Sequence, residues 1–255
     1  MDAKPKPIET INLLLEISSL LMAAGANTNR VNLSIDRFAE ALGYKVSCFI
    51  SHKTIIMTLM DEQNDLNCTR VVNIPPYQIN FSIISAISKA SWNAITEHWA
   101  IEQISTEIET IKTTKRYPKW LVLLAVSMAG AGFCNIFKGD YLNMLVAFIS
   151  TFIGLLVFQK AHALKYNMYI RVFLGALMAS LTASCGIYFG IGALPQSALA
   201  TSILFLVPGV ALINSFTDFL DNNIINGLVR FAMGIMTVLA MAIGLFIAMY
   251  FFQLN

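Results

Sequence analysis

The sequence predicts an α+β domain over residues 1–115, followed by an all-α membrane bundle over residues 116–255. The first observation is composition: 56% of the residues are hydrophobic and 13% are charged, whereas roughly 25% are charged in an average soluble domain. The second is distribution, since most acidic residues precede residue 116 and the chain beyond Lys119 is almost continuously apolar. The third is periodicity, because short strand-like runs occur only in the first part.

Composition and motifs argue against several functions. The net charge of +2 is too small to indicate a nucleic-acid-binding protein, and no basic stripe with interleaved aromatic residues is present. The four cysteines are scattered without a CxxC pair, so neither a disulfide framework nor a zinc site is predicted. The sequence contains no P-loop, no GxGxxG and no cluster of metal ligands. We therefore expect no enzyme, no metal and no cofactor, and the N-terminus predicts no cleavable signal peptide.

Local patterns in the first part predict four helices and three strands. Apolar residues at helical spacing fill the first stretch, and Gly25 suits the C-cap that ends it. Asn27 or Thr28 is the expected N-cap of the next helix. The order ααβββαα favours a small sheet with helices on one face. The expected elements are helices at 8–24 and 28–42, strands at 44–50, 54–60 and 66–74, and helices at 79–96 and 101–115.

No catalytic constellation is evident in this domain. His52 is expected in a hairpin turn and His98 between two helices, and neither has a nucleophile nearby in the sequence. Cys48 alternates with apolar neighbours, which predicts a core position. The charges of the second helix are interpreted as solvated or internally paired, with a regulatory or gating role as the alternative; they are Arg30, Asp36 and Arg37.

Five apolar segments follow, each close to the roughly 20 residues that a membrane-spanning helix needs. A basic stretch precedes Trp120, which is typical of entry from the cytoplasmic side; it comprises Lys112, Lys115, Arg116 and Lys119. Small residues recur within the segments, which indicates close packing in a bundle rather than simple anchors. The segments cover about 120–137, 141–158, 169–191, 197–216 and 228–252.

The cations between the segments predict an orientation. The second connection carries Lys160 and Lys165, with Arg171 just beyond it, and Arg230 follows the fourth segment. The first connection has a single lysine beside an aspartate, and the third has no cation. Because cytoplasmic connections are enriched in Lys and Arg, the N-terminal domain is expected in the cytoplasm and the C-terminus outside.

The fourth segment contains the chain's strongest functional signal. Pro208 and Gly209 interrupt an apolar helix, and a polar tail with Asn214 and Ser215 follows. Broken helices at membrane depth are tolerated where they are buried in protein or line a cavity, as in transporters. The backbone groups freed around Pro208 and Gly209 are expected to bind a carboxylate, with further hydrogen bonds from Asn214 and Ser215.

Four further residues complete the predicted site, each with an alternative. Asp218 is the candidate proton carrier, or an ordinary acid of a cytoplasmic loop. Asn135, near the outer end of the first segment, is a substrate contact or an interface residue. Arg171 and Arg230 are candidate charge partners for a dicarboxylate, although positive-inside anchoring also accounts for them.

The segments RYPKWLVLLAVSMAGAGFCNIFKGD (Arg116–Asp140) and SILFLVPGVALINSFTDFLDNNIINGLVRF (Ser202–Phe231) resemble the threonine/serine exporter family. The stretch LLMAAGANTNRV (Leu20–Val31) is similar to that family's N-terminal signature, and CTRVVNIP (Cys68–Pro75) falls where the family has a comparable strand. The resemblance covers essentially the whole chain. Within the family, the chain looks most like the larger subunit of two-component bacterial inner-membrane exporters associated with succinate.

The resemblance implies export driven by the proton motive force across the bacterial inner membrane, with a cytoplasmic N-terminus and a periplasmic C-terminus. Single-chain members carry a second, smaller membrane module, so the resemblance also implies a separate multi-span partner subunit and assembly into an oligomer. The implied substrates are small carboxylates, with C4 dicarboxylates such as succinate favoured over threonine and serine.

Two functions of other classes remain as alternatives. A membrane-anchored sensor or regulatory protein would place the activity in the N-terminal domain, but small polar residues in several segments favour a transporter. A membrane-embedded enzyme would need paired acidic or histidine residues within the segments, and His162 stands alone in a basic connection.

Overall fold

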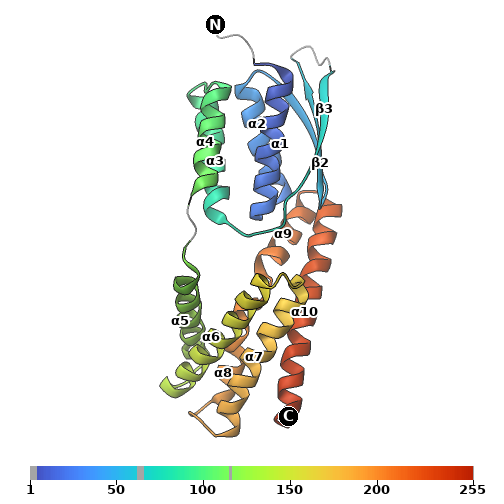
Figure 1. Ribbon diagram of the computed structural model, residues 1–255. Helices are drawn as coiled ribbons and strands as arrows, with labels where there is room; N and C mark the ends of the chain where they lie inside the picture. The colour runs from blue at the N-terminus through green and yellow to red at the C-terminus, as the bar shows by residue number, and fades with distance from the viewer. Residues whose placement is uncertain (1–4, 62–65, 115–116, 255) are drawn as a thin grey trace. The chain divides into compact units, whose positions relative to one another are not determined.

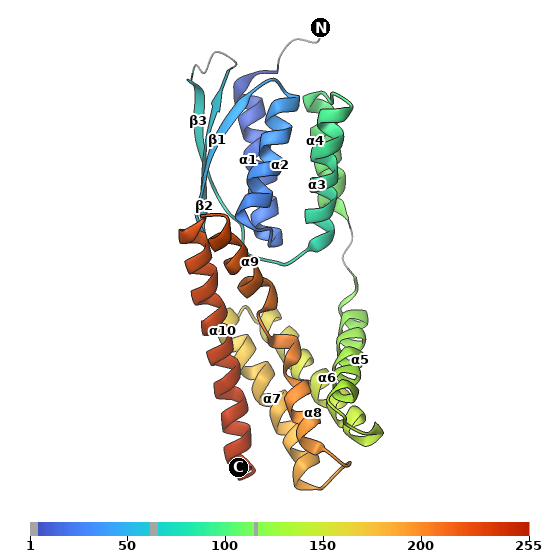
Figure 2. The same ribbon diagram turned by 180° about the vertical axis from the view of Figure 1, so that it is seen from behind.

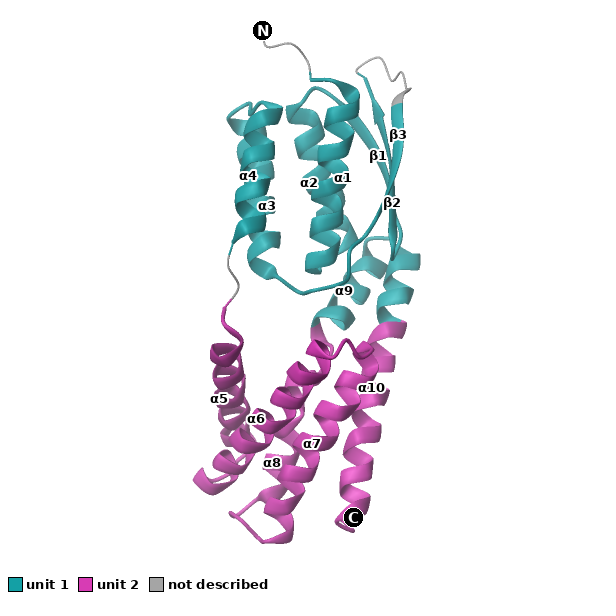
Figure 3. Ribbon diagram, viewed as in Figure 1, with its two compact units in different colours: residues 1–115, 210–231 teal, residues 116–209, 232–255 magenta. Residues whose placement is uncertain are grey.

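The structure is a computed structural model that describes residues 5–61, 66–114 and 117–254. It divides into two compact units, which are described separately (Figure 3). Unit 1 comprises residues 1–115 and 210–231, and unit 2 comprises residues 116–209 and 232–255. The segment 210–231 was expected in the membrane bundle but is grouped with the N-terminal helices and strands. The expected turn at 61–65 lies largely outside the described residues, as do Lys115 and Arg116 of the basic stretch.

Unit 1 has the predicted α+β order ααβββαα, completed by a helical hairpin from later in the chain. A three-stranded sheet lies on one side of the first two helices, and the third and fourth helices lie on their other side (Figures 1 and 2). The elements are α1 (Pro7–Ala24), α2 (Thr28–Ala41), β1 (Lys45–Ile50), β2 (Thr54–Met60), β3 (Leu66–Asn73), α3 (Phe81–Thr96), α4 (Ile101–Thr113) and α9 (Gly209–Leu220), with the start of α10 (Ile224–Phe251).

The sheet is antiparallel in the order β1-β2-β3, and its central strand shows why one face is covered. Ile55, Met57 and Leu59 alternate along β2, and all three are fully buried. Side chains of a strand point alternately to its two faces, so these three face the helices. Their burial with apolar residues of the helices forms the core of unit 1.

The corner between α1 and α2 is set by local sequence. Gly25 adopts φ 95°, a left-handed conformation that suits glycine, and ends α1. The next backbone N–H, that of Ala26, donates to the Leu21 carbonyl at 3.0 Å. Asn27 then caps α2 by accepting a hydrogen bond from the Arg30 N–H at 2.8 Å. Residues Gly25–Thr28 therefore form a fixed corner, and we refer to them as the α1–α2 corner.

Unit 2 is helical and contains α5 to α8 and the larger part of α10. Among the described residues of both units, five helices are long and apolar enough to cross a membrane: α1, α5, α6, α7 and α10. The pair Pro195–Leu206 and Gly209–Leu220 meets the same criterion when taken together. Helix α1 is packed into the core of unit 1, which accounts for its apolar residues. The other elements are α5 (Lys119–Ile136), α6 (Tyr141–Ala163), α7 (Met168–Tyr188), α8 (Pro195–Ser202) and the 3₁₀ turn η1 (Leu204–Leu206).

Helices α6 and α7 are antiparallel neighbours whose register is fixed by glycines. A Cβ placed on Gly154 would lie 2.7 Å from the Ala179 Cβ, and one on Gly186 would lie 2.8 Å from Cγ1 of Val146. Such contacts leave no room for a larger side chain at either glycine. The two helices therefore approach closely, as the small residues predict.

Candidate functional site

The predicted break of the fourth segment is present. Helix α8 ends at Ser202, one 3₁₀ turn follows, and Val207 is extended at φ −60° and ψ 125°. Helix α9 begins at Gly209. Proline disfavours helical conformation in the residue before it, which explains the extended Val207. Pro208 and Gly209 themselves are half-buried.

Beyond the break, α9 and the start of α10 form a tight hairpin, which we call the α9–α10 hairpin (residues 210–231). The hydroxyl of Ser215 donates to the Gly227 carbonyl at 2.7 Å, and both residues are buried. A Cβ on Gly227 would lie 2.8 Å from the Phe219 ring. Ser215, a predicted substrate contact, therefore joins the two helices of this hairpin.

Asp218, on helix α9 of the hairpin, lies fully buried in unit 1 against the α1–α2 corner. Its Oδ1 accepts a hydrogen bond from the Thr28 N–H at 2.9 Å. Its Oδ2 lies 3.1 Å from the Arg230 Nε, an ion pair without hydrogen-bond alignment. Because Thr28 opens α2, the carboxylate also lies at a helix N-terminus, where the helix dipole favours an anion.

Three further side chains of the hairpin hold the same corner. The Arg230 Nη2 donates to the Ala26 carbonyl at 2.8 Å, and the Asn214 Nδ2 donates to the Gly25 carbonyl at 2.8 Å. The Asn226 Nδ2 lies 3.1 Å from the Thr28 Oγ1 and 2.8 Å from the Ile50 carbonyl at the end of β1. We call Asn214, Asp218, Asn226 and Arg230 the corner clamp.

The clamp can transmit a change in charge to the backbone of another element. Backbone groups of Gly25, Ala26 and Thr28 bind its side chains, so a change at Asp218 or Arg230 acts directly on the α1–α2 corner. A buried pair of opposite charges is sensitive to the loss of either partner, because the remaining charge is left uncompensated. Nearby, the pKa of His52 is lowered by burial, by Lys53 and by Arg230.

The remaining predicted site residues lie in unit 2. Asn135 is exposed on α5, among exposed apolar side chains such as Phe133 and Ile136. Arg171, at the start of α7, contacts His162 Nδ1, and its guanidinium lies 5.7 Å from the centre of the Phe158 ring. Among the described residues, no group of three or more His, Cys, Asp or Glu side chains is placed to hold a metal ion.

The other charged and nucleophilic residues of unit 1 have local roles. Arg37 stacks on Trp92, with its guanidinium carbon 3.8 Å from the ring centre. Burial raises the pKa of Asp36. Cys48 is half-buried against the core, where burial and the nearby Asp36 raise its pKa to about 12. A thiol with so high a pKa is a poor nucleophile at neutral pH.

Asp218, Asn214 and Arg230 are among the residues predicted from the sequence, but their contacts with the α1–α2 corner are not. Asn226, which binds that corner and β1, was not predicted as a site residue. An asparagine at the start of the most apolar segment was the available signal, since polar groups there need partners. The partners themselves are about 190 residues earlier in the chain, and local pattern does not predict such pairs.

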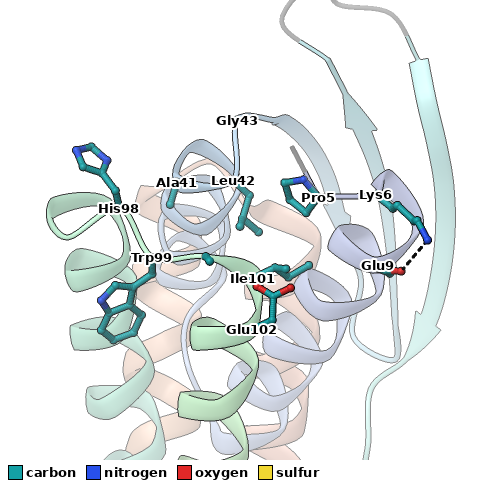
Figure 4. Close-up of a pocket in the computed structure, with 11 residues that line it drawn as sticks. Pro5, Lys6, Glu9, Ala41, Leu42, Gly43, His98, Trp99, Ile101 and Glu102 are labelled. Carbon is teal, nitrogen blue, oxygen red and sulfur yellow. Dashed lines mark ion pairs between the residues drawn. The ribbon is translucent and has the colours of Figure 1, made fainter. Parts of the chain in front are cut away.

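Unit 1 also has an open pocket of ≈ 670 Å³ at the ends of α1, α2 and α4 (Figure 4). Leu42 and Ile101 contribute apolar surface, and Lys6, Glu9 and Glu102 contribute charge. Lys6 and Glu9 form an exposed ion pair at 3.8 Å. The pocket could accept a small amphipathic molecule, and none of the predicted site residues lines it.

In unit 2, a polar network joins the α5–α6 connection to the α7–α8 connection. The Asp140 carboxylate accepts hydrogen bonds from the Asn143 and Ala193 N–H groups at 2.8 and 2.9 Å, which lower its pKa. The Asn143 side chain donates to Ile191 and accepts from Leu194, both at 2.9 Å. Asp140 and Asn143 thus cap α6 and also hold the α7–α8 connection in place.

Comparison with known proteins decides the family. The model of the threonine/serine exporter family (ThrE) matches residues 12–252. The chain belongs to this family. The family is described as one of threonine/serine exporters, so the assignment identifies a membrane transporter, in agreement with the apolar helices of unit 2. The predicted resemblance is confirmed, and no solved structure matches the chain.

Curated relatives in the family fall into two groups. The chain is 27% identical to "Probable succinate transporter subunit YjjP" of Klebsiella aerogenes over 93% of its length and 92% of the relative's. It is 25% identical to the protein of the same name in Escherichia coli, with the same coverage. It is also 21% identical to "Threonine/serine exporter" of Corynebacterium glutamicum, over 87% of this chain and 47% of that protein. The relatives are thus named as transporters or exporters.

Proposed function

We propose that this family member is one subunit of an exporter that moves small carboxylates, most specifically C4 dicarboxylates such as succinate, driven by the proton motive force. The observation that carries this proposal is full-length similarity to proteins named succinate transporter subunits. Similarity to the threonine/serine exporter covers under half of that longer protein. We therefore favour the dicarboxylate, with threonine or serine as the second candidate.

The proposed complex includes a smaller multi-span membrane subunit. The word "subunit" in the names of the two full-length relatives supports this. We place the complex in the bacterial inner membrane, with the N-terminus cytoplasmic and the C-terminus periplasmic. The basic connections around Lys160 and Lys165 and after the fourth segment support that orientation.

We assign proton coupling to Asp218. It is a buried carboxylate whose charge is balanced by Arg230 and by the N-terminus of α2. Protonation would remove the attraction to Arg230 and weaken the hold on the α1–α2 corner, because a neutral carboxyl is a poorer acceptor for Thr28. The proton would thereby change the position of the corner relative to the hairpin within unit 1.

We assign the substrate path to the region of the break. Backbone donors near Pro208 and Gly209 are the proposed contacts for the carboxylate. Asn214 and Ser215 follow in α9, where their present hydrogen bonds go to Gly25 and Gly227. They would contact substrate only in a state in which those bonds are exchanged. Asn135 is the proposed contact with the partner subunit or substrate, and Arg171 and Arg230 are the proposed charge partners.

Transport of labelled succinate and threonine into inverted vesicles tests the proposal, using this chain with and without its partner subunit. We expect succinate uptake that needs both subunits and stops when a protonophore collapses the gradient. Uptake of threonine alone would support the second candidate, and uptake of neither would contradict the exporter proposal. Asp218→Asn should abolish the pH dependence of uptake. Asp221→Asn, which changes an exposed acid three residues later, is the matched control and should leave it intact.

A regulatory function of unit 1 is a second candidate, favoured by the pocket near Leu42 and Ile101. In that case a bound small molecule would alter transport without being carried. Replacing Leu42 by Glu would fill the apolar part of the pocket with charge. If uptake by this variant keeps its rate and its response to cytoplasmic metabolites, the pocket has no regulatory function.

A further inference from the structure

Among the described residues of unit 2, three buried hydroxyls lack hydrogen-bond partners, in contrast to their neighbours. They belong to Ser150 on α6 and to Ser180 and Ser184 on α7, and each is fully buried. A buried hydroxyl without a partner is costly. A serine or threonine inside a helix ordinarily avoids this cost by bonding to a carbonyl one turn earlier.

Other hydroxyls of unit 2 make that local bond. Thr182 donates to the Met178 carbonyl at 2.8 Å, although it lies between Ser180 and Ser184 on the same helix. Ser127, Thr201 and Ser202 likewise donate to carbonyls three or four residues earlier, each at 2.8 Å. The hydroxyls of Ser150, Ser180 and Ser184 therefore differ from these others in having no hydrogen-bond partner.

The helix register brings these hydroxyls to one level. Val146 lies opposite Gly186, and Gly154 lies opposite Ala179. Along the antiparallel pair, Ser150 therefore falls between the levels of Ser180 and Ser184. The next residue of α6, Thr151, donates to the Ser202 carbonyl at 3.4 Å.

The Thr151–Ser202 hydrogen bond connects the level of these hydroxyls with the break in the fourth segment. Ser202 is the last residue of α8, and only Ile203 separates it from the 3₁₀ turn. On the α6 side, this level is thus in contact with the end of α8, just before the break. We call Ser150, Thr151, Ser180 and Ser184 the hydroxyl layer.

The hydroxyl layer also has a distinctive electrostatic character. Among the described side chains that are buried in unit 2, none is charged. An ionised carboxylate placed there would lose its hydration without gaining a counter-charge, which costs far more than burying a neutral group. An uncharged carboxyl group has one donor and retains acceptor capacity, and serine hydroxyls can satisfy both.

We infer that the hydroxyl layer is a binding site for one carboxyl group of the transported acid, taken up in its protonated, uncharged form. This inference rests on the proposed function, since it concerns the substrate of the same transporter. The free hydroxyls of Ser150, Ser180 and Ser184 supply the hydrogen bonds. The carboxyl group in turn satisfies hydroxyls that the protein leaves without partners.

Binding and exchange are measured separately, so that the two proposals can fail independently. Binding of succinate to the purified two-subunit complex is followed by the shift in its melting temperature. Exchange is followed in vesicles with equal pH on both sides and no membrane potential, which removes the driving force. We expect the apparent affinity for succinate to rise about tenfold for each pH unit of acidification while the bound carboxyl is mainly ionised in solution, because only the protonated group binds.

Alanine variants test the hydroxyls themselves. Ser180→Ala and Ser184→Ala should each weaken succinate binding and raise KM for exchange roughly 3- to 10-fold, the loss expected for one hydrogen bond. The unliganded variants should melt at the wild-type temperature or above it, since an unpaired buried hydroxyl has been removed. Thr182→Ala is the matched control, because that hydroxyl already has a partner, and its KM should be unchanged.

Each result is decisive. Serine variants that bind and exchange succinate as the wild type does would overturn the hydroxyl layer and leave the exporter proposal standing. Equal losses in Thr182→Ala and the serine variants would also overturn it, since they would indicate a packing effect. Serine-dependent binding without transport would support the layer and contradict the exporter. A complex that neither binds nor exchanges succinate would contradict both.

Discussion

The Arg230 Nε lies 3.1 Å from the Asp218 Oδ2, and these side chains are 11% and 0% exposed. Each partner also binds the backbone of the α1–α2 corner, Asp218 through the Thr28 N–H and Arg230 through the Ala26 carbonyl. The pair therefore links the α9–α10 hairpin to a corner about 190 residues earlier in the chain. Loss of either charge would therefore weaken the hydrogen bonds that hold the α1–α2 corner.

Breaking this ion pair should destabilise unit 1. Asp218→Asn leaves the Arg230 charge buried without compensation, which typically costs about 3 kcal/mol or more. The double variant Asp218→Asn/Arg230→Met removes both charges and should recover most of that loss. Chemical denaturation of the purified complex measures both effects. An unchanged unfolding midpoint in the single variant would show that the pair is not important for folding.

Asn226 should matter more for stability than its neighbour Asn223. Asn226→Ala removes buried hydrogen bonds to Thr28 and Ile50, at an expected cost of about 1–3 kcal/mol. The Asn223 side chain makes one exposed contact of 3.4 Å, so Asn223→Ala should cost less than about 0.5 kcal/mol. Thermal unfolding distinguishes the two variants. Similar melting temperatures for both would contradict the importance of the corner clamp.

Two glycines at the α7–α8 connection provide a matched pair. Gly192 has φ 83°, and a Cβ there would lie 2.3 Å from the Asn143 Nδ2 and 2.6 Å from the Asp140 Oδ1. Gly190 has φ 64°, and a Cβ there would meet nothing within 4 Å. Gly190→Ala should cost only the strain of a left-handed residue, about 1 kcal/mol. Gly192→Ala adds a clash with the polar network and should melt at a clearly lower temperature in the same assay.

His52 should make stability fall at acidic pH. Its folded-state pKa is lowered from about 6.5 by burial, Lys53 and Arg230. Between the lowered value and the unfolded value, the unfolded chain binds more protons, so the free energy of unfolding decreases as the pH falls below about 6.5. His52→Gln should remove this part of the pH dependence. The comparison is the unfolding midpoint of wild type and variant between pH 7.5 and 5 (roughly the range over which histidine titrates). If the unfolding midpoint depends on pH in the same way in both proteins, the prediction for His52 is wrong.

Several features were determined by the sequence because their causes are local. The helix end at Gly25, the cap at Asn27 and the alternation of Ile55, Met57 and Leu59 each depend on a few neighbouring residues. The apolar segments and the break at Pro208 follow from composition and from the backbone restriction of proline. The family also followed from residues in the chain, and the family model confirms it.

Tertiary structure alone decided which residues the polar tail of the broken helix meets. Asp218, Asn214 and Arg230 stood out as polar residues, but their partners at the α1–α2 corner are nearly 200 positions away. Local periodicity in the sequence does not predict contacts between residues so far apart. The same holds for Ser150, Ser180 and Ser184, which lie within apolar segments and were not singled out from the sequence as site residues. Only the three-dimensional arrangement reveals that their hydroxyls are buried without partners, because satisfaction of a polar group depends on everything that surrounds it.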